Sequence, residues 1–222
     1  MQKRLVRKLD LELALSNIEP HPSPQAYLEQ YTITTEVAAE LLYIAAYTYN
    51  DIIGKTIADL GCGTGRLAIG AVLLGAEETV GVDVDKIATK TAIRNARRLG
   101  VKTKTQWITT DIATLHGNFD TVIQNPPFGV QKPKADRKFL EKALEIGKTI
   151  YSLHKSSEVN RKSKTLRLVP SPFLNRFIES HGGEIKAVHT MPMIIPHMFN
   201  FHRKPKHQFL ADLYVIKTRL NF

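Results

Sequence analysis

The sequence predicts an α/β fold in which helices cover both faces of a seven-stranded, mostly parallel sheet. Two observations carry this prediction. From Thr56 onward, short apolar, β-branched runs alternate with helical patterns at the intervals of strand–helix–strand units. The last two predicted strands follow each other without an obvious helix between them, which predicts one antiparallel strand. With 222 residues, the chain suits one such domain with a sizeable core.

Two helices are predicted ahead of the sheet. Leu5, Leu9 and Leu13 recur at helical spacing and predict an amphipathic helix over residues 3–16. A second apolar stripe predicts a helix over residues 35–49.

These two helices would form an N-terminal extension, residues 1–50, of a single domain that spans 1–222. Strands are predicted at 56–60, 79–83, 105–109, 119–124, 149–154, 184–191 and 210–219, and further helices at 65–75, 85–98, 136–146 and 171–181.

The composition indicates a basic protein of a reducing compartment. The formal net charge of +10 and a pI near 9.7 favour a polyanionic partner. A single cysteine, Cys62, excludes an internal disulfide and a cysteine-based zinc site, and its place in a glycine turn suits a packing residue rather than a nucleophile. Acidic residues interrupt the N-terminal apolar run, and the histidines lack metal-ligand spacing. We therefore expect a cytoplasmic protein without a membrane span or a metal.

The run Asn125-Pro126-Pro127-Phe128 follows a predicted apolar strand and suits methylation of an amine on a nucleobase. Such an amine is a poor nucleophile, so a catalyst must accept its N–H hydrogen bonds and hold the nitrogen against an electrophile. The Asn125 amide oxygen can accept one bond. The two prolines restrict the backbone so that the Pro126 carbonyl can accept another, and Phe128 can stack on the base. On these residues alone, a simple turn remains the alternative.

A glycine-rich turn, Gly61-Cys62-Gly63-Thr64-Gly65, joins the first strand to a helix of small residues. Glycines let a ligand approach the backbone closely at this strand end, where open α/β sheets bind ligands. A dinucleotide pyrophosphate is the weaker interpretation, because Arg66 stands where that fingerprint has its third glycine. Asp83 ends the second strand, where an acid can bind ribose hydroxyls; Asp59 and Asp83 could otherwise be ordinary strand-end acids.

Together, the two motifs resemble the class I S-adenosylmethionine-dependent methyltransferases, which have a Rossmann-like fold. More narrowly, residues 28–31, 125–129, 151–157 and 201–204 resemble the methyltransferase-like-five family of ribosomal-RNA adenine N6-methyltransferases. The resemblance implies S-adenosyl-L-methionine as cofactor and adenine N6 of small-subunit ribosomal RNA as the methylated group. One departure is Ile33, where the family usually has a threonine in contact with the cofactor; Thr32 or Thr34 could substitute.

The resemblance also implies which residues form the site. Asn125 and Pro126 would accept from the target amine, with Pro127 and Phe128 completing the catalytic motif. The glycine turn would lie under the methionine part of the cofactor, and Asp111, which otherwise suits a helix cap, would receive its adenine with Ile112. The implied cofactor-binding residues are Gln30, Tyr31, Asp59, Gly61, Gly63, Thr64, Gly65, Asp83, Asp111 and Ile112.

Two partners are expected. Basic residues cluster at 132–138, 155–167 and 202–207, near the strand ends where a substrate should arrive, and favour contact with an RNA backbone. The strand Thr105 to Thr109 should lie at the sheet edge, and the resembling family binds a small zinc-containing activator there by strand addition. Trp107 could instead pack against a neighbouring helix.

Three alternative functions stay open. The motif also occurs in ribosomal guanine N2-methyltransferases, and protein glutamine N5-methyltransferases use the same chemistry, although usually with tyrosine in place of Phe128. A noncatalytic RNA-binding assembly factor on a methyltransferase scaffold is the alternative outside the enzymes.

Overall fold

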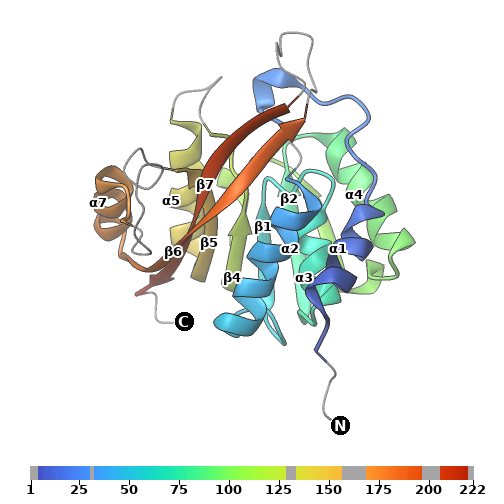
Figure 1. Cartoon of the computed structure of the whole chain (residues 1–222), viewed down its shortest axis with the longest axis horizontal. Helices are drawn as coiled ribbons and strands as arrows, with labels where there is room; N and C mark the ends of the chain where they lie inside the picture. The colour runs from blue at the N-terminus through green and yellow to red at the C-terminus, as the bar shows by residue number, and fades with distance from the viewer. Residues whose placement is uncertain (1–4, 31–32, 129–133, 157–168, 197–205, 220–222) are drawn as a thin grey trace.

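The computed structural model describes residues 5–30, 33–128, 134–156, 169–196 and 206–219. Seven strands form one sheet in the order β3-β2-β1-β4-β5-β7-β6 (Figure 1). β7 runs antiparallel to both of its neighbours and the other pairings are parallel, which confirms the predicted fold class. The strands are β1 Thr56–Leu60, β2 Glu78–Asp83, β3 Thr105–Thr109, β4 Phe119–Gln124, β5 Gly147–Lys155, β6 Gly183–Pro196 and β7 Lys206–Thr218.

Helices cover both faces of the sheet (Figure 1). Most buried apolar residues of α1, α2 and α3, together with Ala96 of α4, belong to one apolar core, and those of α5 and α7 belong to a second core on the opposite face. α2 continues without a break into a π-helical turn, Ile44–Thr48, and three short 3-10 turns lie at Ala26–Leu28, Lys102–Lys104 and Ile112–Thr114. The helices are α1 Lys8–Ser16, α2 Thr35–Tyr43, α3 Arg66–Leu73, α4 Lys86–Arg98, α5 Ala135–Ile146 and α7 Pro172–Ser180.

α1 packs through a different leucine stripe from the one that predicted it. Leu11 and Leu15 are buried, and Leu15 lies against Gly70 of α3. Leu5, Leu9 and Leu13 are 58–66% exposed, so the stripe that predicted the helix is not the one that packs against the core. Leucines at alternate positions supply two stripes with helical spacing, and only packing against α2 and α3 selects the inner one.

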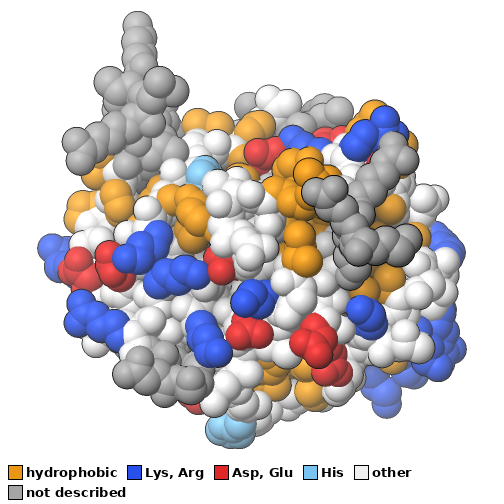
Figure 2. All heavy atoms as spheres, turned by 90° about the horizontal axis from the view of Figure 1, so that it is seen from below, with side chains coloured by type: hydrophobic (Ala, Val, Ile, Leu, Met, Phe, Trp, Pro, Cys, Tyr) orange, Lys and Arg blue, Asp and Glu red, His pale blue; other side chains and the backbone are white. Residues whose placement is uncertain are grey.

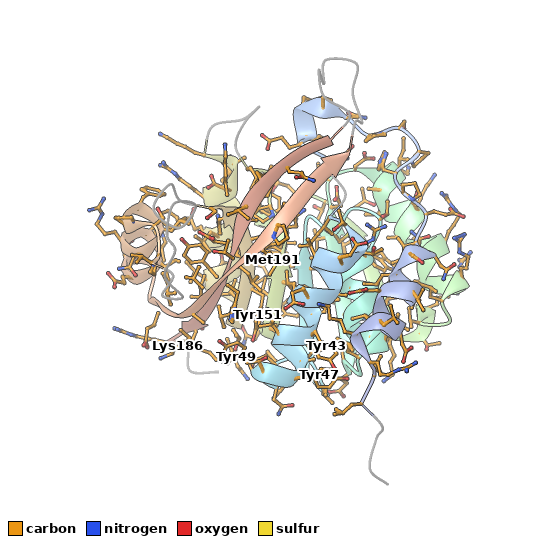
Figure 3. All side chains as sticks on the ribbon, viewed as in Figure 1. Tyr43, Tyr47, Tyr49, Tyr151, Lys186 and Met191 are labelled. Carbon is orange, nitrogen blue, oxygen red and sulfur yellow. The ribbon has the colours of Figure 1, made fainter. Side chains whose placement is uncertain are left out.

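The segment after α2 is tied to the centre of the sheet by polar side chains. The Tyr151 hydroxyl on β5 donates to Asp51 Oδ2 at 2.8 Å, and Lys217 Nζ on β7 donates to Asp51 Oδ1 at 3.0 Å. The Tyr49 ring lies 6.3 Å from the Tyr151 ring, and Figure 3 shows both between α2 and the β6–β7 pair. These contacts to β5 and β7 hold the helical extension near the amino ends of β1 and β4.

That end of the molecule carries mixed charge. Figure 2 looks at it from below, where lysine and arginine side chains are interspersed with acidic ones. Within the described ranges, no helix has both the length and the apolar character needed to cross a bilayer. The division into one domain with an extension at residues 1–50 stays a prediction.

Candidate active site

A cavity of about 570 Å³ opens where β1, β2 and β4 end. Its size is typical of sites for small molecules, and its place is where open α/β sheets bind ligands. Most of the residues predicted from the sequence line it: Gln30, Asp59, Gly61, Gly63, Thr64, Asp83, Asp111, Ile112, Asn125 and Pro127.

Three predicted residues are placed differently, and a fourth is not described. Gly65 lies beneath the Trp107 ring, which leaves no room for a side chain there. Phe128 packs edge-to-face on Phe209 of β7, with 5.4 Å between the ring centroids. Pro126 and Phe128 are not among the lining residues, and Tyr31 lies outside the described residues.

The glycine turn leaves its cavity side open. Gly61 and Gly63 have φ values of +69° and +55°, which residues with a side chain rarely adopt. A Cβ on Gly61 would lie 2.8 Å from the Phe139 ring, whereas a Cβ on Gly63 would meet no described atom within 4 Å. The backbone at Gly63 therefore stays accessible to a ligand.

Asp83 anchors this turn from β2. Its Oδ2 accepts the Gly63 N–H at 2.8 Å and its Oδ1 accepts the Asp85 N–H at 2.9 Å. Burial raises the pKa of Asp83, and the two backbone hydrogen bonds oppose that shift. Each oxygen keeps a second lone pair that a ligand hydroxyl can use.

Asp59 is a second buried acid, at the end of β1. It is 1% exposed and accepts the Ala68 N–H at 3.0 Å. Burial raises its pKa from 3.8 to about 7; the nearby Asp83 adds to the shift and the Ala68 bond opposes it. Asp59 therefore changes charge close to neutral pH.

Asp59→Asn is expected to stabilise the cofactor-free protein at pH 8 and to have little effect near pH 4. A carboxyl whose pKa is raised by folding costs stability as pH rises from 3.8 to about 7, and the amide removes that cost. The gain in the free energy of unfolding at pH 8 should reach at most ~4 kcal/mol, because each unit of pKa shift corresponds to ~1.4 kcal/mol. Urea unfolding at the two pH values measures it.

Asp120→Asn is the matched comparison, with the opposite sign. Burial works against ionisation of Asp120, but hydrogen bonds from Thr56 and Lys148 dominate and lower its pKa. That stabilisation is present at neutral pH and is lost as pH falls through the lowered pKa, so this variant should lose stability at pH 8. An Asp59→Asn effect that does not change with pH would contradict the assignment.

A polar network that the sequence did not predict lies behind Gln30. The Gln30 amide donates to Asp85 Oδ2 at 2.7 Å, and His21 Nε2 lies 3.0 Å from the same oxygen. His21 Nδ1 accepts the Ser23 N–H, so Nε2 carries the proton that is donated to Asp85. The network fixes Gln30 at the cavity wall. Residues 21 and 85 are 64 positions apart, and no sequence spacing reveals such a contact.

Two other expectations can be compared with the geometry. Asp111 caps the 3-10 turn by accepting the Ala113 N–H at 2.9 Å, and it also lines the cavity. Thr34 caps α2 by accepting the Val37 N–H, so its hydroxyl already has a structural role.

The Asn125 side-chain oxygen can accept a hydrogen bond, but no described residue donates one to it. Its Oδ1 is buried and has no hydrogen-bond partner among the described residues. A buried oxygen in this state is costly unless a bound molecule supplies the donor. Because Asn125 lines the cavity beside the glycine turn, a ligand amine in the cavity could supply it.

Two titratable side chains near the motif are unsuited to proton transfer or attack. His154 hydrogen-bonds to Ser152 Oγ at 2.8 Å, and burial lowers its pKa to about 4, so the ring is neutral at pH 7. Burial, followed by the fields of Asp59 and Asp83, raises the pKa of the Cys62 thiol. Both side chains suit packing roles, as the sequence indicated.

The sheet order, the glycine turn on β1 and the acid on β2 together define a class I methyltransferase. The model of the ribosomal protein L11 methyltransferase family, PrmA, matches residues 34–126. The rRNA N(6)-adenosine-methyltransferase METTL5 of Danio rerio is 36% identical, over 67% of this chain and 74% of its own length. The chain therefore belongs to the METTL5 family, and S-adenosylmethionine is its methyl donor, as predicted from the sequence.

Two other similar proteins cover nearly the whole chain. An uncharacterised protein of Methanocaldococcus jannaschii is 39% identical, over 90% of this chain and 89% of its own length. The solved structure of a proposed RNA methyltransferase from Pyrococcus horikoshii is 38% identical, with a TM-score of 0.84, and covers 98% of this chain and 100% of its own.

Proposed function

We propose that this protein transfers the methyl group of S-adenosylmethionine to N6 of an adenosine in ribosomal RNA, and that the RNA is that of the small subunit. The observation that carries the proposal is the buried Asn125 Oδ1, which lacks a described donor and lies in the cavity of the glycine turn. The METTL5 relative of Danio rerio is named as an rRNA N(6)-adenosine-methyltransferase, which supports the choice of adenine in RNA.

The residues that line the cavity fit the cofactor. Gly63 leaves space for close approach of the methionine part, next to Gly61 and Thr64. Asp83 keeps acceptor capacity for the ribose hydroxyls, and Asp111 with Ile112 forms the wall for the adenine. We assign Asp59, Gln30 and Gly65 to supporting positions, since Gln30 bonds to Asp85 and Gly65 gives room to Trp107.

The chemistry requires positioning more than proton abstraction. The bound cofactor supplies an electrophilic methyl group on a sulfonium. Asn125 Oδ1 and the Pro126 carbonyl accept the two N–H bonds of the target amine and aim its lone pair, while Pro127 holds the backbone. The surplus proton leaves to water after transfer. Phe128, held on Phe209, would stack on the flipped or single-stranded base.

The described basic residues of the 132–138 stretch divide into two groups. Lys134 and Lys138 line the cavity and would meet phosphate near the target base. Arg137 instead lies over the Phe173 ring, with its guanidinium carbon 4.3 Å from the centroid, and so packs against α7. Lys132 and most of the other two basic stretches lie outside the described residues, and their contact with RNA stays a prediction.

The test is incorporation of labelled methyl into unmodified ribosomal RNA, followed by nucleoside analysis. N6-methyladenosine supports the proposal. N2-methylguanosine selects the guanine enzyme. Cofactor binding without any methylated nucleoside selects the assembly factor or the protein glutamine methyltransferase, and methyl labelling of ribosome-associated protein then separates these two. The PrmA match cannot separate these alternatives, because it ends at residue 126 and omits Phe128.

We also propose that a small zinc-containing activator adds a strand to β3. Among the described strands, β3 pairs with β2 alone and forms one edge of the sheet. Ile108 is 37% exposed on that edge. Trp107 does not support the proposal, because it packs inward on Gly65 and Gly81. We keep a cytoplasmic location as part of the same proposal.

Ile108→Asp is expected to abolish complex formation with the activator while the monomer keeps its melting temperature within about 2 °C, because the residue is exposed. Size-exclusion chromatography of the mixed proteins measures the complex. Thr103→Asp, at an exposed position just before β3, is the comparison for charge alone. Full activity of the isolated protein, unchanged by Ile108→Asp, would remove the case for an activator.

A further inference from the structure

Arg66 places a half-buried cation at the cofactor cavity. It begins α3, directly after the glycine turn, and lines the cavity. Its Nη1 donates to the Ile33 carbonyl oxygen, and its Nε is buried without a hydrogen-bond partner among the described residues. The guanidinium stays charged in proteins and has five N–H donors, so it retains donors for a ligand.

The charges around Arg66 are unequally distributed. Four acidic side chains line the cavity: Glu29, Asp59, Asp83 and Asp111. The other lining cations described, Lys134 and Lys138, belong to α5 and its N-cap. Glu36, in the first turn of α2, partly compensates the charge of Arg66. Arg66 is the lining cation that directly follows the glycine turn along the chain.

The amino-acid part of the cofactor needs both signs of charge. Its ammonium group suits the carboxylates of the cavity, but its carboxylate requires a donor, preferably a cation. Ile33 also lines the cavity, but its side chain has no hydrogen-bonding group and cannot bind this carboxylate. A guanidinium matches a carboxylate in shape and can bind it with two N–H groups.

We propose that Arg66 binds the carboxylate of the S-adenosylmethionine methionine part and so selects the intact amino acid. The Ile33 carbonyl holds the guanidinium in place for this contact. The inference rests on the proposed function, because it requires the cavity to bind this cofactor. A purely structural tie between α3 and residue 33 is the rival role, and it predicts no preference between ligands.

The test compares two ligands that differ by one carboxylate, S-adenosylmethionine and decarboxylated S-adenosylmethionine. Their affinities are measured by calorimetry without RNA. The wild type is expected to bind the intact cofactor at least ~10-fold more tightly, as charged hydrogen bonds allow. Arg66→Met should lower the affinity for the intact cofactor at least ~10-fold and change the affinity for the decarboxylated ligand less than ~3-fold. The preference for the intact cofactor then disappears.

Two further variants separate charge from structure. Arg66→Gln keeps an N–H donor for the Ile33 carbonyl and removes the charge, so it should behave like Arg66→Met. Lys138→Met removes another cavity cation and should keep the preference. A preference retained in Arg66→Gln, or lost in Lys138→Met, would overturn the assignment of the carboxylate to Arg66.

The outcomes also separate this inference from the proposed function. If the wild type binds neither ligand, the cofactor site itself is wrong. If the wild type binds both ligands equally, or if Arg66→Met weakens both to the same extent, only the role of Arg66 fails. Retained binding of the decarboxylated ligand shows that a variant is folded.

Discussion

Asn125→Ala is expected to lower kcat at least ~100-fold while the cofactor dissociation constant stays within a few-fold. The buried Oδ1 lacks a donor among the described residues, so its hydrogen bond to the target amine should form mainly in the reacting complex. Single-turnover methylation of ribosomal RNA and cofactor calorimetry, on the same preparation, measure the two quantities.

Asn175→Ala is the matched control, because Asn175 lies on α7 and its amide donates to Glu179 Oε1. This variant should keep wild-type turnover. If Asn125→Ala instead weakened the cofactor as much as it lowered turnover, Asn125 would belong to the cofactor site rather than to the acceptor site.

Asp83→Ala is expected to raise the cofactor dissociation constant ~10- to 100-fold and to spare RNA affinity. The variant loses an ionised acceptor for the ribose, worth ~1.5–3 kcal/mol, and also releases the Gly63 N–H that holds the turn. Asp83→Asn keeps one acceptor oxygen and should lose less cofactor affinity than Asp83→Ala. Calorimetry with the cofactor and filter binding with RNA measure the two effects.

The pH dependence of cofactor binding gives an independent check. Burial raises the pKa of Asp83, so affinity should begin to fall at a higher pH than an ordinary carboxyl would give, as the acid becomes protonated. Glu141→Ala, an exposed change on α5, should leave both affinity and its pH profile unchanged. An unchanged dissociation constant in Asp83→Ala would exclude the ribose assignment.

The strands were predictable because each is marked in the sequence by a short run of apolar, β-branched residues. β1 and β3 match their predicted limits, since each is a short run bounded by turn residues. Helix α1 begins at Lys8, later than predicted, and the sequence did not determine its buried side, because alternate leucines fit two faces equally well. The choice between those faces depends on residues of α2 and α3 that no local pattern includes.

The candidate site shows the same division. The glycine turn and the Asn125 motif were predictable, since their backbone requirements demand particular residues in sequence. The pairing of His21 with Asp85 and the position of Phe139 over Gly61 were not predictable, because each joins distant segments. Arg66 did leave a signal, as the residue that breaks the dinucleotide fingerprint, but its proximity to Ile33 appears only in the folded chain.

The packing of Trp107 gives the protein a built-in optical probe. The chain has one tryptophan, so its intrinsic indole emission comes from a single place. That ring lies on Gly65, at the end of the turn that lines the cavity, and on Gly81 of β2. Its Nε1 is buried without a described hydrogen-bond partner, so small shifts of the turn or of the β3 edge change the polarity around the ring. Ligand occupancy and strand addition can therefore be followed by fluorescence without a label.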